Sequence, residues 1–183
     1  MISQIDTAIT HADRIVAGVT PEDLDAATPC SAWDVRALLN HLVGGMRIFA
    51  AELTGTGPVG EHESDWLGAD PQAAFETAAR LDRQAWQRPD ALAATVHISL
   101  GALPGHVAAS VHLTELVVHA VDLAVATEQE TLVSEELCAE QLRLMRSAGI
   151  DAYRVPGVFG AEVAVAPDAP AHLQLLAYLG RAL

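Results

Sequence analysis

Four residues that can do chemistry stand at helical spacing in the segment HLTELVVHAVDLA, residues 112–124. His112, Glu115, His119 and Asp122 are separated by three, four and three positions. On a helix that turns by about 100° per residue they share one stripe. Apolar residues fill most of the other positions, whereas a surface helix would show water a broad polar face. We therefore predict a buried helix that directs an ionisable stripe inward, where carboxylates and imidazoles need partners.

Glu115 and His119 are the pair best suited to hold a metal ion. They lie four residues apart, which brings both to one side of a helix. Carboxylate oxygen and neutral imidazole are good ligands for Zn²⁺ and related ions. A third ligand must come from a facing helix, and His41 is the leading candidate, because Gly45 beside it leaves room for a ligand or substrate. Two histidines and one carboxylate leave coordination positions open, as catalytic zinc sites do.

The same residues also allow an interpretation without a metal. A glutamate four residues before a histidine is common on helices, and a histidine in an apolar helix is usually a hydrogen-bonded core residue. His112 fits a fourth ligand, a partner of a ligand, a proton shuttle or a polar group in a pocket wall. Asp122 fits a carboxylate that orients a ligating histidine, or the partner of an arginine. Glu115, His112 and Asp122 are the candidates for catalytic roles.

The remaining histidines and the first cysteine carry weaker signals. Cys30 comes just before a predicted helix, where a helix N-terminus can lower the pKa of a thiol. A small buried side chain near a helix cap explains the same residue more simply. His97 is expected on the solvent side of a strand, and His62 and His172 are expected on the surface.

Composition limits the classes of partner. The chain has 183 residues, 51% of them hydrophobic and 4% aromatic, so we predict one domain over residues 1–183 with a core of alanine, leucine and valine. The net charge of −14 disfavours nucleic acids and anionic membranes, which reward basic patches. Two distant cysteines and an N-terminus unlike a signal peptide favour a reducing cytoplasm. We expect a small-molecule substrate and a monomer or homodimer.

Helical patterns dominate the chain. Apolar spacing and capping residues predict helices over about 3–18, 31–53, 70–88, 105–126 and 134–149, a helical turn at 20–24 and a short helix from Pro170. Ser31 is the expected cap of the second helix, with Asp34 in the capping-box position. Alternating apolar residues predict strands at 95–100 and 161–166. The expected fold class is mainly α, a bundle of about four long helices with a small two-stranded β element.

Three stretches, taken together, resemble a known family. TPCSAWDVRALLNHLVGG, HLTELVVHAVDLA and FGAEVAVAPDAPAHLQLLAYLGR look like the mycothiol-dependent, maleylpyruvate isomerase-like branch of the DinB superfamily, actinobacterial proteins with a four-helix bundle. The resemblance covers nearly the whole chain, with its pieces in order. It departs at Val121, where the family usually has tryptophan, and at ATEQE, where the family often has ATG.

The resemblance implies a divalent metal, commonly zinc, held by His41, Glu115 and His119. It also implies that water or the thiolate of mycothiol fills the open positions. A metal-bound thiol is deprotonated, and thiolate is the nucleophile. The implied function is a thiol transferase or isomerase that uses mycothiol as cosubstrate and acts on a small electrophile or an unsaturated acid.

Two other functions stay open at this point. One is a non-catalytic metal- or small-molecule-binding protein of the DinB fold. The other is a DinB-fold enzyme of specialised metabolism that uses no thiol. Helical bundles support many functions, so the fold alone cannot choose among the three.

Overall fold

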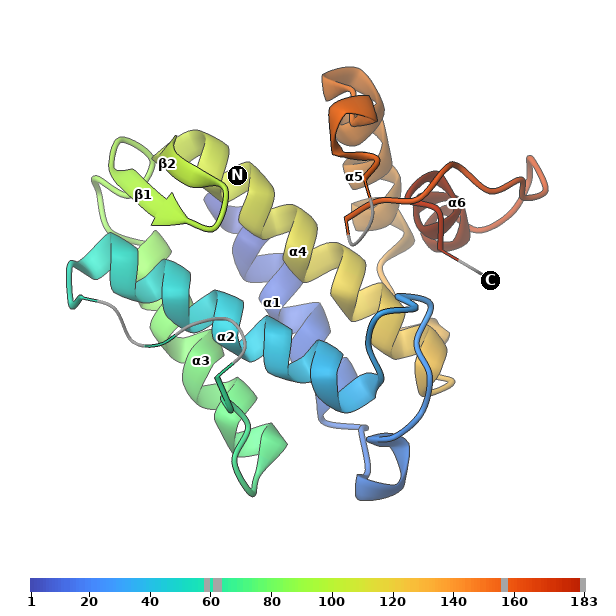
Figure 1. Cartoon of the computed structure of the whole chain (residues 1–183), viewed down its shortest axis with the longest axis horizontal. Coiled ribbons are helices and arrows are strands. Elements are labelled where there is room, and N and C mark those ends of the chain that lie inside the picture. The colour runs from blue at the N-terminus through green and yellow to red at the C-terminus, as the bar shows by residue number, and fades with distance from the viewer. Residues whose placement is uncertain (58–59, 61–63, 156–157, 182–183) are drawn as a thin grey trace.

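Four helices form the bundle that positions the candidate site in the computed structural model (Figure 1). The structure describes residues 1–183 except 58–59, 61–63, 156–157 and 182–183. The bundle helices are α1 (Ile2–Val16), α2 (Val35–Thr54), α3 (Pro71–Trp86) and α4 (Gly105–Ala126). α1 and α2 each pack against both α3 and α4. The predicted class, mainly α with a four-helix bundle and a small β element, is confirmed.

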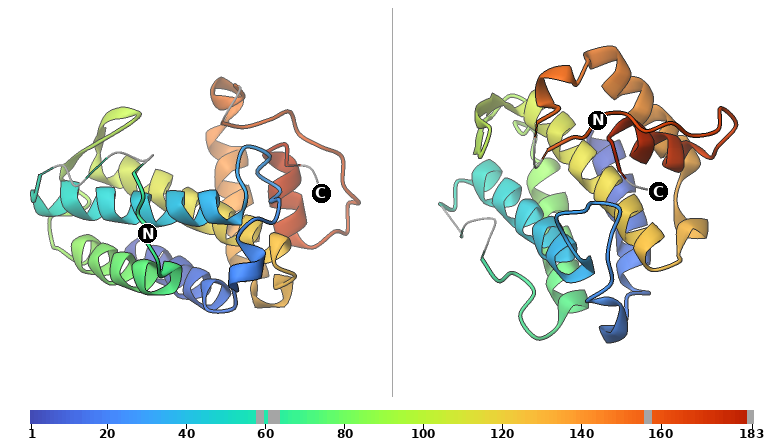
Figure 2. Two further views of the ribbon diagram at one scale, coloured as in Figure 1. Left: turned by 60° about the horizontal axis from the view of Figure 1, so that its bottom comes forward. Right: turned by 45° about the vertical axis from the view of Figure 1, so that its right-hand side comes forward.

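Two further helices lie beside α4, on the side away from α3 (Figure 2). They are α5 (Glu135–Ala148) and α6 (Ala171–Tyr178), which pack against each other and against α4. Ser134 caps α5 by accepting a hydrogen bond from Leu137 N–H, as its sequence predicts. The described residues also form three short 3₁₀ turns: η1 (Pro21–Asp23), η2 (Glu130–Leu132) and η3 (Asp151–Tyr153).

The start of α2 differs from the prediction. Asp34, and not the expected Ser31, is the N-cap, and its side chain accepts a hydrogen bond from Ala37 N–H at 2.7 Å. The Thr28 hydroxyl donates to the backbone carbonyls of Cys30 and Trp33. Such side-chain bonds to the backbone compete with a helix, so the preceding residues stay in a loop. Trp33 is therefore outside the helix, beside the candidate site.

The small β element is a hairpin of β1 (Thr95–Ile98) and β2 (Gly101–Pro104). The strands are antiparallel, with Thr95 opposite Pro104 and Ile98 opposite Gly101. The prediction that residues 161–166 form the second strand is wrong. Val163 N–H donates to a carbonyl of α6 instead, and alternation makes a strand only where a partner edge is available. Pro104 is tolerated because β2 is an edge strand, with β1 as its partner in the two-stranded sheet.

α4 is the central apolar helix. Its buried face runs almost all the way round and includes three polar residues, His112, His119 and Asp122. By length and composition alone α4 could cross a membrane, but 72% of its most apolar window is buried inside the protein. A core helix of a bundle passes that test for the same reason, and the prediction of a buried helix with a polar stripe is confirmed.

Candidate metal centre

Three side chains converge where α2 faces α4. His41 of α2 and Glu115 and His119 of α4 each offer one ligand atom, and these atoms lie within 4.8 Å of one another. Glu115 Oε2 is 2.9 Å from His41 Nε2 and 3.1 Å from His119 Nε2. Two imidazole nitrogens and one carboxylate oxygen around a common point form a donor set that suits Zn²⁺. The three residues singled out from the sequence are thus together in space.

The centre is deep on one side and accessible on the other. The side chain of His119 is 7% exposed, that of His41 23% and that of Glu115 38%. Glu115 and His119 share a face because they lie one turn apart on α4, and His41 reaches them from the second turn of α2. A small molecule can therefore reach the ligand atoms from the side of Glu115.

Opposing effects set the charges of the centre. Desolvation on its own would raise the pKa of Glu115, but hydrogen bonds from His119 and His41 and the charges of both rings hold that pKa well below its usual range. Desolvation would lower the pKa of His119, but hydrogen bonds to Asp122 and Glu115 and their charges raise it to about 9. The metal-free centre therefore contains a glutamate carboxylate and a protonated His119 at neutral pH.

Asp122 contacts both kinds of partner considered from the sequence, a histidine and an arginine. Its Oδ2 accepts a hydrogen bond from His119 Nδ1–H at 3.1 Å, and the same oxygen lies 3.4 Å from Arg181 Nη2. Asp122 is fully buried and Arg181 nearly so. Because Asp122 holds the proton on Nδ1, the other ring nitrogen of His119 is directed at the centre. Sequence reasoning missed Arg181, which lies 59 residues away and carries no local signal.

Trp33 and Cys30 lie in the loop before α2. The Trp33 ring centroid is 4.4 Å from that of His41 and 5.4 Å from that of His119, so the indole forms one wall of the centre. Sequence reasoning missed this role. The lowered pKa considered for Cys30 is wrong. Burial, the largest effect, raises the pKa of this thiol against the opposing charge of Arg181.

His112 lies apart from the three candidate ligands. Its Nε2 is 2.6 Å from Asp82 Oδ2 of α3, and both residues are buried. The ring also contacts Phe49 and Trp86. The second oxygen of Asp82 and the indole N–H of Trp86 have no hydrogen-bond partner among the described residues. The catalytic role of His112 stays a prediction, with Asp82 as the partner that sequence reasoning did not find.

The other histidines divide between core and surface. His97 is exposed as predicted, and its ring contacts Glu52. The surface position expected for His172 is wrong, because this residue is buried and its ring contacts Glu135 at the start of α5. His62 lies outside the described residues.

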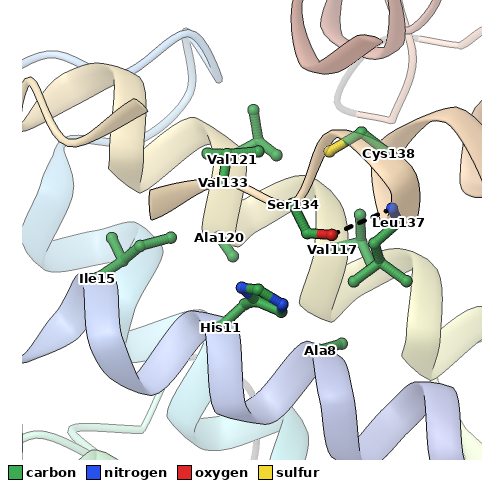
Figure 3. A pocket seen from close by; sticks show the side chains of 10 residues that line it. All are labelled: Ala8, His11, Ile15, Val117, Ala120, Val121, Val133, Ser134, Leu137 and Cys138. Carbon is green, nitrogen blue, oxygen red and sulfur yellow. Dashed lines mark hydrogen bonds between the residues drawn. The ribbon is translucent and has the colours of Figure 1, made fainter. Parts of the chain in front are cut away.

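A small cavity lies between α1, α4 and α5, and none of the three candidate ligands lines it (Figure 3). Its walls are mostly apolar, and Val121 is one of them. His11 points into it, and its Nδ1 has no hydrogen-bond partner among the described residues. Cys138 also lines it, and burial raises the pKa of that thiol to about 12. A thiol with such a pKa is inert.

The four-helix bundle and its His–Glu–His centre define the class: a DinB-like helical protein with a candidate metal centre. The chain belongs to the mycothiol maleylpyruvate isomerase N-terminal domain family, whose model matches residues 5–124. All three candidate ligands and Asp122 are inside that match, whereas α5, α6 and Arg181 are outside it.

Two relatives from Mycobacterium tuberculosis are similar over almost their whole length. They are the uncharacterized proteins MT0763 of strain CDC 1551 and Rv0738 of strain H37Rv. Each is 33% identical over 168 residues, which cover 91% of this chain and 90% of the relative. No solved structure matches the chain significantly.

Proposed function

We propose that this chain is a divalent-metal-dependent thiol transferase or isomerase, with zinc as the ion and mycothiol as the thiol cosubstrate. The observation that carries the proposal is the convergence of His41, Glu115 and His119 at a point that stays partly accessible. Family membership supports mycothiol as the thiol, because the family is named after a mycothiol maleylpyruvate isomerase. The second substrate is a small electrophile or an unsaturated acid, and no nucleic acid or membrane takes part.

Each residue has a task in this proposal. His41, Glu115 and His119 supply three ligand atoms and leave positions for an incoming group. Asp122 keeps the proton on Nδ1 of His119, so that Nε2 can offer its lone pair. The bound ion supplies a Lewis acid that lowers the pKa of a thiol. Trp33 shields one side of the centre from water.

The thiolate accounts for both reaction classes. Attack on an electrophilic carbon forms a carbon–sulfur bond and expels the leaving group, which is transfer. Addition to a double bond conjugated with a carbonyl leaves a single bond that can rotate. Elimination of the thiolate then restores the double bond in the other geometry, which is isomerisation.

A second candidate function is a non-catalytic metal- or small-molecule-binding protein, and the hydrogen bonds of the centre favour its small-molecule-binding form. Glu115 Oε2 accepts from both histidines, so the three groups satisfy one another without an ion. An enzyme of specialised metabolism that uses no thiol would keep the metal and ignore thiols. Metal content and thiol consumption together separate the three functions.

The first test is metal content. Elemental analysis of protein purified without chelators should find about one equivalent of divalent metal per chain, and His119→Ala should have lost it. Equal, low metal content in both proteins would refute the proposal. Metal in the wild type without consumption of mycothiol, over a panel of electrophiles and unsaturated acids, would support one of the two alternatives.

The second test identifies the nucleophile. Cys30→Ser should retain most thiol-consuming activity, because the sulfur that reacts belongs to the cosubstrate. Glu115→Gln should lose most of it, because a neutral amide is a poor ligand. With the metal site kept saturated at each pH, the rate should change little with pH even well below pH ~8.5, where a free thiol ionises. The reverse pair of mutant results would make Cys30 the nucleophile.

A further inference from the structure

Two consecutive glycines, Gly44 and Gly45, stand in the middle of α2. A glycine inside a helix destabilises it relative to alanine, because the unfolded chain has more freedom to lose. Neither residue has a positive φ, so the backbone of α2 does not require glycine at these positions. Each glycine therefore needs a reason outside the helix.

Gly44 has a packing reason. It is buried, and a Cβ added there would meet Trp66 at 2.5 Å from Nε1 and 2.6 Å from Cδ1. Trp66 is fixed in that place, because its backbone N–H donates to Asn40 Oδ1 at 2.8 Å and the Arg47 guanidinium lies 5.6 Å from its ring centroid. The indole of Trp66 therefore packs directly against the backbone of Gly44, where a side chain would clash with it.

Gly45 has no packing reason among the described residues. A Cβ added there would meet none of their atoms within 4 Å, and the residue is only partly buried. Alanine would therefore fit, and it would favour the helix. The observation that remains is the place of Gly45, beside the candidate metal centre.

Gly45 follows His41 by one helical turn, so a side chain at position 45 would stand on the same face of α2 as the imidazole. Trp33, which precedes α2, covers His41 from the other end, with ring centroids 4.4 Å apart. Glu115, which contacts His41 from α4, has a partly exposed side chain. The described residues thus leave an open space beside Gly45, and through this space a molecule can approach the ligand atoms.

We infer that Gly45 keeps open the space through which a molecule reaches His41, Glu115 and His119, and that it limits the size of the molecule accepted there. The identity of this molecule as a thiol rests on the proposed function, whereas the size limit does not. In this account glycine at position 45 lowers the stability of α2 and leaves space for a ligand beside the metal centre.

Gly45→Ala, Gly45→Leu and the control Gly44→Ala test the inference. Gly45→Ala should raise the melting temperature by about 2 °C, the expected gain for removing an unconstrained helical glycine. Gly44→Ala should lower it, because the added methyl group meets Trp66. All Gly45 variants should bind Co²⁺ as tightly as the wild type, because position 45 supplies no ligand.

Ligand size is the second measurement, made on Co²⁺-loaded protein from the shift in its visible spectrum. The probes are 2-mercaptoethanol and mycothiol as small and large thiols, and azide and benzoate as a small and a large ligand without sulfur. In Gly45→Leu the large ligands should bind more weakly on the order of tenfold, while the small ones keep their affinity. Gly45→Ala should lie between Gly45→Leu and the wild type.

The outcomes separate this inference from the proposed function. If the wild type binds azide and benzoate but neither thiol, the thiol proposal fails, and the azide and benzoate results still decide the role of Gly45. Equal binding of large ligands by Gly45→Leu and the wild type overturns the inference. Loss of Co²⁺ from Gly45→Leu, or a wild type that binds no probe, overturns it as well.

Discussion

At the scale of single residues, His119 controls the charge of the centre. One ring nitrogen contacts Glu115 and the other contacts Asp122, with both distances at 3.1 Å. Burial opposes a charged ring, but the two carboxylates raise the pKa of His119 to about 9. The proton on Nε2 occupies the position that a metal ion would take. Proton and metal therefore compete for one nitrogen atom.

This competition predicts that metal affinity rises with pH between about 6.5 and 9. Below the pKa of His119, each bound ion must displace about one proton, so affinity should increase about tenfold per pH unit and level off above 9. Calorimetric titration in two buffers with different ionisation enthalpies counts the released protons. Affinity that does not change over this range would contradict the assignment of His119 as a ligand.

Asp122 allows a second prediction at this scale. Asp122→Ala removes the acceptor that orients His119, so metal affinity should fall about 10- to 100-fold. Competition with a coloured chelator measures the change. Asp122→Asn keeps an acceptor oxygen of similar shape and should lose less. An Asp122→Ala protein that is folded and binds metal as the wild type does would show that Asp122 serves only Arg181.

At the scale of elements, helix ends decide where the site residues lie. Asp34 is the N-cap of α2, so Trp33 lies in the loop before the helix, where its ring packs near His41 of the centre. α6 follows Pro170, and its N-terminus has no side-chain cap of its own. Glu135 of α5 caps α6 instead, because its carboxylate accepts hydrogen bonds from the backbone N–H groups of Ala171 and His172. α5 thereby holds the helix that precedes Arg181.

We predict that Glu135→Ala loosens α6. The loss of a helix cap costs about 1 kcal/mol of unfolding free energy, and amide hydrogen exchange should become faster over Ala171–Tyr178. Glu136→Ala is the matched control, because Glu136 is also in the first turn of α5 and makes no hydrogen bond to α6 in the described part of the chain. Equal effects of the two substitutions would show that general charge at α5 matters and the cap does not.

At the scale of the whole molecule, the bundle encloses negative charge in an already acidic protein. The net charge is −14, and Asp82 and Asp122 are fully buried in the interior. Asp82 contacts His112, and Asp122 contacts the Arg181 guanidinium. Glu115 depends on the two histidines or on a bound cation. A metal ion should therefore bind the folded bundle and not the unfolded chain.

Metal removal should lower the stability of the whole molecule. A ligand held at about 100 times its dissociation constant contributes about 2.7 kcal/mol, which corresponds to about 5 to 10 °C in melting temperature for a chain of this size. Calorimetry before chelation, after it and after return of the metal measures the shift, and His119→Ala should show none. Chelated protein with proven metal loss and an unchanged melting temperature would count against the site.

The pH dependence of stability has a definite sign. The folded-state pKa of His119 is raised from 6.5 to about 9. Its contribution to metal-free protein is therefore fully present below pH 6.5 and is lost as the pH rises towards 9. Metal binding strengthens over the same window, so the difference in melting temperature between loaded and metal-free protein should widen from pH 6.5 to 9.

Local sequence was enough to place most of the helices, though not the start of α2, and to pair two of the three candidate ligands. The apolar period and the caps Asp70 and Ser134 predicted α3 and α5, because a helix depends on contacts within a few residues. The spacing of Glu115 and His119 predicted that they share a face for the same reason. His41 could only be proposed as the third group, and the family resemblance supported it before its position in space was known.

Tertiary structure alone decided the partners of the buried charges and the walls of the centre. Arg181 reaches Asp122 across 59 positions and Asp82 reaches His112 across 30. The partner of β1 and the burial of His172 also differed from what their own segments predicted. Periodicity and capping are encoded within one or two turns of chain. The partner of a buried side chain depends on which surfaces the packed helices bring together, and no single segment contains that information.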